Sequence, residues 1–354
     1  MPIFLLISFT ANGLMERRIG VRGKVHGRRM GYRLQRILEE NDGRFVSGQE
    51  IGRRLGTSRA AVWKQVQTLR RRGFGIEGAR GAGYRLLGRP DVIEEAELAS
   101  RLASPSFWKS FHILAVTDST NSRAVALAET GAPHGTIVCA DAQTGGRGRF
   151  ARSWESPPGL NVYVSFLLRP PVEPAQAPQL TLVTAVALAA AVEASTGLSA
   201  RLKWPNDLYL GGRKAAGILA EMSADADRLR HVVIGTGLNV NAEPADFPPG
   251  LRERATSLSI QAGRAFPRVE VLARFLDCFT DAYGAYIAEG IRGVLPEWRR
   301  RSLLDGRRVV IRLRGEDAAG TAVGVDDAGF LVFRRDGGRE TETIAGGEIV
   351  SFEG

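Results

Sequence analysis

The sequence predicts an α+β protein with several domains: an N-terminal winged helix-turn-helix, a central mixed β-sheet with helices, and a small C-terminal β-barrel. Its 354 residues exceed the roughly 100–200 of one domain, and 44% are hydrophobic, enough for more than one core. Along the chain, apolar residues are spaced first as in helices, then alternately as in strands and helices, and finally as in short strands. We expect an unstructured lead-in at 1–29 (Met30 is an alternative start), domains at 30–88, 91–301 and 302–354, and a linker at Gly88–Pro90.

The front domain has the element order of a winged helix-turn-helix. A helix is expected at 32–40, a second with a Ser start at 47–55, a turn at 56–58, a third helix at 59–72 and a β-hairpin at 74–86. Ser58 can cap the third helix by accepting backbone N–H bonds. In such folds the third helix enters the DNA major groove, where Arg and Lys read guanine and Gln reads adenine.

The charge distribution favours a polyanionic partner for this domain. Residues 1–89 carry 19 Lys and Arg against 6 Asp and Glu, whereas the rest of the chain has a net charge of −3. This asymmetry is typical of a nucleic-acid-binding module joined to another domain. The candidate DNA-contacting residues are Ser58, Arg59, Lys64, Gln65 and Thr68, with Arg80 in the hairpin wing. The alternative is a helical packing module with a solvated basic surface.

Strands and helices alternate through the central block and give way to strands alone. Strands are expected at 161–168 and 231–240, and helices at 180–196 and 268–289. The apolar run Leu180–Val192 is too short to span a membrane and indicates a buried helix. Short runs between turn residues at 309–313, 320–325, 329–334 and 341–344 predict the C-terminal barrel.

Arginine alternates with glycine in the segment Thr144–Arg152. Glycine lets backbone N–H groups approach a ligand, and arginine offsets the charge of phosphate and carboxylate oxygens. We interpret the segment as a loop that covers an activated, phosphate-containing intermediate. It is not a P-loop, because no Gly-Lys-Ser/Thr follows. An ordinary basic surface turn is the alternative.

The motif Lys203-Trp-Pro-Asn-Asp207 is followed by the turn signal Gly211-Gly212 and by Lys214. A hairpin here makes Asp207 and Lys214 face each other. A fixed ammonium group reduces the repulsion between an attacking carboxylate and a phosphate, and it stabilises the charge that develops. The alternative is a surface ion pair, commonly worth under about 1 kcal/mol.

Two further polar segments are candidates for ligand contact. Asp118-Ser-Thr-Asn121 follows a strand expected at 111–116 and offers hydroxyl and amide groups to a polar ligand, to a helix N-terminus, or to both. Gly235-Thr-Gly-Leu-Asn239-Val-Asn241 places glycines on a strand, where a ligand or closely packed sheet neighbours can lie against bare backbone.

The cysteines and histidines predict no metal or redox centre. Cys139 and Cys278 lie in apolar surroundings without the spacing of a zinc or redox pair, so we expect buried thiols and a reducing cytoplasm. The four histidines are scattered along the chain, and no metal-ligand cluster is predicted.

Together these motifs strongly resemble the biotin protein ligase family, from about Arg33 to the C-terminus. The stretch from Ser47 to Leu69, and notably Ser58–Arg70, resembles the helix-turn-helix of bifunctional biotin ligase/biotin operon repressors. The combination of Ser119-Thr-Asn121, the loop at 143–149 and Lys203–Asp207 is specific to the ligases. The resemblance implies a class II synthetase-like central fold and an SH3-like C-terminal barrel.

The sequence departs from the family pattern in two places. Phe150 and Ala151 stand where the family often has a basic residue followed by glycine. Ala151 lacks the freedom of glycine at positive φ, so the family's disorder-to-order behaviour is not carried over to this loop, whereas its ligand contacts are. Residues 1–29 have no counterpart in the family pattern.

The resemblance implies that biotin and MgATP form biotinyl-5′-adenylate and pyrophosphate, and that biotin then passes to a lysine of a carboxylase carrier domain. Lys214, with Arg149 and Asp207, is implied to be catalytic. The implied biotin-binding residues are Ser119, Thr120, Asn121, Gln143, Arg147, Gly148, Arg149, Lys214, Gly235 and Gly237. The implied nucleotide-binding residues are Arg149, Arg152, Trp154, Lys203, Asn206 and Asn239.

The resemblance further implies an adenylate-bound homodimer on a two-fold-symmetric operator. No membrane partner is expected, because no stretch reaches about 18 uninterrupted apolar residues. Three functions stay open: a ligase that is also a repressor, a ligase without repression, and a ligand-sensing DNA-binding regulator with an inactive enzyme domain. An inactive enzyme domain is expected to have lost Arg147, Asp207 or Lys214, and all three residues are present. A lipoate-attaching relative shares the central fold, but the winged helix and the Gly-Arg-Gly-Arg loop argue against it.

Overall fold

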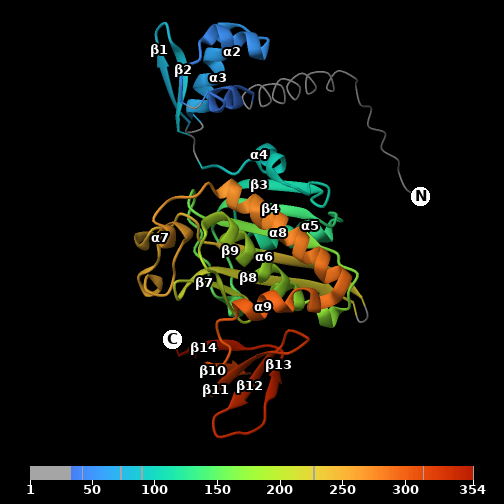
Figure 1. Ribbon diagram of the computed structural model, residues 1–354. Helices are drawn as coiled ribbons and strands as arrows, with labels where there is room; N and C mark the ends of the chain where they lie inside the picture. Colours follow the sequence, from blue (N-terminus) through green and yellow to red (C-terminus); the bar gives the residue numbers. More distant parts are fainter. Residues whose placement is uncertain are drawn as a thin grey trace, which may run out of the picture. The chain divides into compact units, whose positions relative to one another are not determined.

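The computed structural model describes residues 33–41, 43–71, 74–88, 91–225, 228–313 and 315–353. The chain divides into two compact units, 1–90 and 91–354, which are coloured along the sequence in Figure 1. The lead-in expected at 1–29 and the alternative start at Met30 lie outside the described residues.

The first unit has the predicted element order. It contains a helix over 33–39, α2 (Gly48–Leu55), α3 (Arg59–Arg71), β1 (Gly75–Ala79) and β2 (Gly83–Gly88), the last two paired as an antiparallel hairpin. The Ser58 hydroxyl accepts the Ala61 N–H at 3.2 Å, as expected of a helix cap. The core of this unit consists of Leu34, Ile37, Leu38, Val46, Ile51, Leu55, Val62, Val66, Leu69, Phe74 and Ile76.

The second unit is built on a seven-stranded mixed sheet with the order β3-β4-β5-β9-β8-β7-β6. Its strands are β3 (Ser110–Thr117), β4 (Thr136–Gln143), β5 (Val162–Leu168), β6 (Arg201–Lys203), β7 (Asp207–Leu210), β8 (Arg213–Ala224) and β9 (Leu229–Leu238). Only β3 and β4 are parallel; the other pairs are antiparallel. This pairing brings the ends of β3, β4 and β9 and the start of β8 to one end of the sheet.

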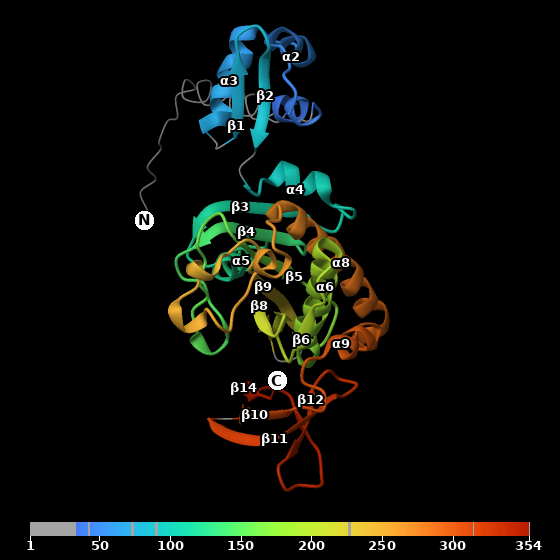
Figure 2. The same cartoon turned by 60° about the vertical axis from the view of Figure 1, so that its left-hand side comes forward.

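Helices cover both faces of this sheet. They are α4 (Glu95–Arg101), α5 (Thr120–Glu129), α6 (Gln179–Thr196), α7 (Leu258–Ala262), α8 (Arg268–Glu289) and α9 (Leu295–Arg301), with 3₁₀ turns at Arg149–Ala151, Pro174–Gln176, Pro244–Asp246, Pro249–Leu251 and Gly290–Gly293. Figure 2 shows α6 and α8 on one side of strands β8 and β9. Side chains of β4 alternate: Ile137 and Cys139 join the core with α6 and α8, whereas Val138 packs with α5.

Helix α6 is the apolar segment that the sequence analysis expected to be buried. Among the described residues, Pro174–Thr196 is the one helical stretch long and apolar enough to cross a membrane, and 67% of its most apolar window is buried inside the protein. Of the two free cysteines, Cys139 is buried as expected, but Cys278 is only half-buried because α8 turns this position toward the edge of the core.

The C-terminal part is a five-stranded antiparallel sheet with the order β13-β12-β11-β10-β14. Its strands are β10 (Arg308–Leu313), β11 (Glu316–Val325), β12 (Leu331–Arg335), β13 (Glu342–Ile344) and β14 (Glu348–Phe352). The predicted all-β end of the chain is confirmed. The strand β14 was missed, and it is the one that reaches the site described below.

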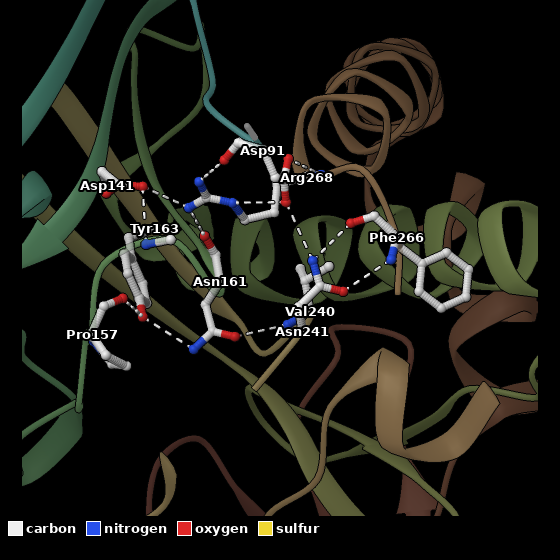
Figure 3. A network of polar contacts seen from close by, with 10 residues as sticks. Asp91, Asp141, Pro157, Asn161, Tyr163, Val240, Asn241, Phe266 and Arg268 are labelled. Carbon is white, nitrogen blue, oxygen red and sulfur yellow. Dashed lines mark hydrogen bonds and ion pairs between the residues drawn. The ribbon is translucent and has the colours of Figure 1, made fainter. Parts of the chain in front are cut away.

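A buried arginine connects the strands near that end of the sheet (Figure 3). Arg268, the first residue of α8, is 1% exposed. Its Nε donates to Asp91 Oδ2 at 3.1 Å, and its Nη1 donates to Asp141 Oδ1 at 2.8 Å and to the Asn161 carbonyl at 3.1 Å. One side chain therefore joins the first residue of the second unit to β4 and to the start of β5.

Candidate active site

A cavity of about 850 Å³ opens at this end of the sheet, beside the C-terminal strands. It is lined by every residue implied to be catalytic or to contact biotin or the nucleotide: Ser119, Thr120, Asn121, Gln143, Arg147, Gly148, Arg149, Arg152, Trp154, Lys203, Asn206, Asp207, Lys214, Gly235, Gly237 and Asn239. Asp118 and Asn241, at the ends of the two further polar segments, are not part of its lining. Its size is that of a pocket for a small molecule or cofactor. These predicted residues, from Ser119 to Asn239, span 120 residues of sequence and line one site.

One end of the cavity is lined by neutral polar groups. Ser119 caps α5, with its Oγ accepting the Ser122 N–H at 3.5 Å. The Thr120 N–H and hydroxyl both donate to Gln143 Oε1, at 2.8 and 3.1 Å. The Gln143 amide in turn donates to Ser156 Oγ at 2.9 Å. These bonds fix the orientation of hydroxyl and amide groups that can recognise an uncharged polar ring.

Asn121 is held in this end of the cavity by two other side chains. Its Nδ2 donates to Glu221 Oε2 at 2.7 Å, and its Oδ1 accepts from Ser165 Oγ at 2.6 Å. A Cβ added at Gly235 would lie 2.0 Å from Asn121 Oδ1. Position 235 must therefore be glycine for Asn121 to lie where it does. Asn121 contacts the bare backbone against which the sequence predicted a ligand or a closely packed sheet neighbour.

Glu221 also connects to the glycine- and arginine-rich loop. Arg147 Nη2 lies 3.0 Å from Glu221 Oε2, the same oxygen that accepts from Asn121. Neither Glu221 on β8 nor Ser165 on β5 was among the predicted site residues, because each lies outside the motifs. For Ser165, a hydroxyl within the apolar run of β5 was the signal available in the sequence.

The other end of the cavity is cationic. Lys214 Nζ lies 2.7 Å from Asp207 Oδ1, so the predicted hairpin pair is formed. The strand register places Lys214 opposite Tyr209, and the ion pair is therefore diagonal across the hairpin. The Lys214 N–H donates to the Arg254 carbonyl at 2.8 Å, which fixes the backbone from which the ammonium group extends.

The indole of Trp154 forms the wall beside Lys214. Lys214 Nζ lies 5.6 Å from the centre of the ring. A Cβ added at Gly237 would lie 2.5 Å from the indole, and one at Gly217 would lie 3.1 Å from it. The bare backbone of Gly237 thus accommodates Trp154 in this structure.

The C-terminal sheet supplies part of the cationic end. Arg149 donates to Asn206 Oδ1 and to the Gly347 carbonyl, both at 3.2 Å. Lys203 Nζ donates to the Ile349 carbonyl at 3.0 Å. Arg152 forms an ion pair with Glu348. Nothing in the sequence pattern indicated that β14 and the residues before it contribute to the site.

Burial changes the acidity of two of these cations. It lowers the pKa of Arg149, while the carboxylates of Asp207 and Glu348 oppose this change. Burial also lowers the pKa of Lys203, again opposed by Asp207. Positive charge concentrated in a partly desolvated wall is suited to an anionic ligand such as a phosphate.

The amides of two candidates are engaged by the backbone. Asn206 Nδ2 donates to the Ile218 carbonyl and Asn239 Nδ2 donates to the Thr256 carbonyl, both at 2.9 Å. Both residues line the cavity, and these bonds fix how their remaining polar atoms are presented.

The departures at Phe150 and Ala151 have a structural consequence. Both residues have left-handed backbone angles, with φ of 57° and 56°. Such angles cost a non-glycine residue about 1 kcal/mol or more. The loop therefore adopts the conformation that glycine would favour, but with a penalty at two successive residues.

The candidate DNA-contacting residues lie in the first unit. Arg59 and Lys64 on α3 and Arg80 between β1 and β2 are exposed. The hydroxyls of Ser58 and Thr68 make local bonds, to the Ala61 N–H and to the Lys64 carbonyl, respectively. Gln65 is half-buried. Its side chain is therefore less accessible to a partner than those of Arg59 and Lys64.

Comparison with known proteins gives matches to all three parts of the chain. Residues 113–239 match the Biotin/lipoate A/B protein ligase family, residues 32–85 an HTH domain, and residues 306–350 the Biotin protein ligase C terminal domain. A biotin protein ligase from Aquifex aeolicus in complex with biotin and ATP is similar in structure, with a TM-score of 0.60 and 31% identity. The match covers 70% of this chain and 99% of that one. Fold and site define a ligase of the biotin/lipoate class.

Relatives that match over more than four-fifths of this chain have both a ligase and a repressor activity in their names. The Bifunctional ligase/repressor BirA of Bacillus subtilis is 39% identical, covering 85% of this chain and 93% of its own length. That of Escherichia coli is 31% identical, covering 84% and 90%. This chain belongs to the family of bifunctional biotin protein ligases and repressors.

Proposed function

We propose that this chain joins biotin to ATP, forming biotinyl-5′-adenylate, transfers the biotinyl group to a lysine of a carboxylase carrier domain, and represses transcription in response to biotin. The observation that carries the ligase proposal is the single cavity with a neutral polar end at Thr120 and Gln143 and a cationic end at Lys214 and Arg149. These two ends match the uncharged ring of biotin and the phosphates of ATP.

In the first step, a biotin carboxylate oxygen bonds to the α-phosphorus of ATP and the bond to pyrophosphate breaks. Lys214 and Arg149 line the cationic end, and their charges reduce the repulsion between the two anions as they meet. In the second step, a carrier lysine amine bonds to the acyl carbon and AMP leaves. Asp207 orients Lys214 through the 2.7 Å ion pair, and the chain needs no covalent nucleophile of its own.

We propose the same residue roles that the resemblance implies. Biotin contacts Ser119, Thr120, Asn121, Gln143, Arg147, Gly148, Arg149, Lys214, Gly235 and Gly237, and the nucleotide contacts Arg149, Arg152, Trp154, Lys203, Asn206 and Asn239. The described residues form no group of three or more His, Cys, Asp or Glu side chains suited to a metal. Mg²⁺ is therefore proposed only as the partner of the ATP phosphates, as is common for this ion.

For repression, we propose that α3 enters the major groove of operator DNA and that Arg80 contacts phosphates, with the adenylate-bound protein acting as a homodimer. Exposed cations at Arg59 and Lys64 support the DNA contact. Because ATP and operator DNA are cytoplasmic, we infer a cytoplasmic location.

The test combines two assays on the full-length protein: labelling of a carrier domain with biotin and ATP, and a gel shift on the biotin-synthesis promoter of the same genome. We expect labelling, and a shift that requires biotin and ATP. A variant lacking residues 1–88 should label the carrier without shifting DNA. Labelling without any shift would indicate a ligase that does not repress, and a shift without labelling would indicate a sensor with an inactive enzyme domain.

Glu221→Ala should weaken biotin binding specifically. The change leaves Asn121 Nδ2 with only the Leu219 carbonyl at 3.3 Å and leaves Arg147 without its carboxylate. Loss of a charge-assisted hydrogen bond, about 1.5 kcal/mol, predicts a rise of about tenfold in KM for biotin, with KM for ATP unchanged. Glu221→Gln keeps an acceptor for Asn121 and should show a smaller rise. Equal rises in both KM values would contradict this role in positioning Asn121 and Arg147.

A further inference from the structure

Trp63 is exposed in the middle of helix α3. Val62, Val66 and Leu69 are fully buried, and they fix the rotation of the helix about its axis. Trp63 consequently points away from the core and is 56% exposed. An aromatic ring supplies a large apolar contact area, and here that ring lies on the exposed face of α3.

The charge around this ring is positive. Arg59 and Lys64 of α3 are both exposed, and the sequence of this helix has no acidic residue. Among the described residues, no carboxylate pairs with Arg59 or Lys64. Elsewhere in the unit, Glu50 pairs with Arg53 and Arg54, and Glu77 pairs with Arg85. The face around Trp63 therefore combines free cations with one large apolar ring.

We propose that Trp63 is a specificity-determining residue that contacts a thymine methyl group in the major groove of the operator. The inference rests on the proposed repressor function. Trp63 is the fifth residue of α3, in the N-terminal half from which recognition helices contact base edges. The thymine C5-methyl is the apolar group that the major groove presents, and the neighbouring cations match the flanking phosphates and guanine edges.

The experiment uses the full-length protein with biotin and ATP, and a duplex that it enriches from a random-sequence library. Trp63→Ala should bind this duplex at least about tenfold more weakly and bind a scrambled duplex with unchanged affinity. Leu87→Ala is the matched control, because Leu87 is an equally exposed apolar residue of the same unit, at 64%. Carrier labelling by Trp63→Ala should equal that of the unchanged protein, showing that the second unit is intact.

Replacing each thymine of the enriched duplex by uracil, which lacks the methyl group, identifies the contact. At one or more positions the unchanged protein should lose several-fold affinity, and Trp63→Ala should lose none. Equal binding of the enriched duplex by Trp63→Ala would overturn the inference and leave repression standing. Failure of the unchanged protein to enrich any sequence would overturn repression as well. A change in oligomeric state by Trp63→Ala would assign the ring to a second copy of the chain and overturn the DNA contact.

Discussion

Replacing Lys214 by alanine is expected to slow adenylate formation by at least about 10²–10³-fold, the usual effect of removing one preorganised group that stabilises developing charge. Lys214 is held by Asp207 at 2.7 Å and by the backbone bond to Arg254, so its ammonium group is fixed before any ligand arrives. The measurement is the rate of pyrophosphate release at saturating biotin and ATP. A rate equal to that of the unchanged protein would remove Lys214 from the mechanism.

Arg213→Ala is the matched control for this substitution. Arg213 is the neighbouring cation on β8, but it does not line the cavity. Because stabilisation depends on where the charge lies and not on the net charge, Arg213→Ala should form the adenylate within about twofold of the rate of the unchanged protein. Supplying biotinyl-adenylate directly separates the two steps. We expect Lys214→Ala to transfer biotin from the supplied adenylate more readily than it forms the adenylate from biotin and ATP.

The convergence of the motifs could be predicted from sequence because each lies at the end of a strand. Gln143 ends β4, Asp118–Asn121 follow β3, and Lys214 is the second residue of β8. Helices α6 and α8 could also be predicted, because the first is largely apolar and the second has apolar residues at helical spacing over a long stretch. These features depend on residues close together in the chain, so the sequence was sufficient to predict them.

The contacts that hold the site together could not be predicted in the same way. Glu348 reaches Arg152 from a sheet almost 200 residues further along the chain, and no motif marks it. Gly235 and Gly237 were rightly singled out as bare backbone, but the sequence did not show that Asn121 and Trp154 would lie against them. Such side-chain placement depends on tertiary packing, and it cannot be inferred from the periodicity of apolar residues along the sequence.

Arg268 is a further case of this kind, and its replacement is expected to have the largest effect on stability. In the sequence it is one charged residue at the start of a helix. In the structure it is 1% exposed and bonded to both Asp91 and Asp141 (Figure 3). Arg268→Met retains much of the volume but leaves two carboxylates without their cation. Removing one partner of a buried ion pair costs about 3–5 kcal/mol.

The expected loss in the free energy of unfolding is at the lower end, about 3 kcal/mol, because Asp91 and Asp141 are each about one-third exposed and water can solvate them in part. Urea unfolding of the full chain measures it. Arg335→Ala, which breaks the exposed pair with Glu342, should cost less than about 1 kcal/mol. A loss of similar size in both variants would show that the Arg268 network contributes no more than a surface ion pair. Because Arg268 also bonds to Asn161 at the start of β5, a large loss would show that the strands forming the cavity depend on a residue outside it.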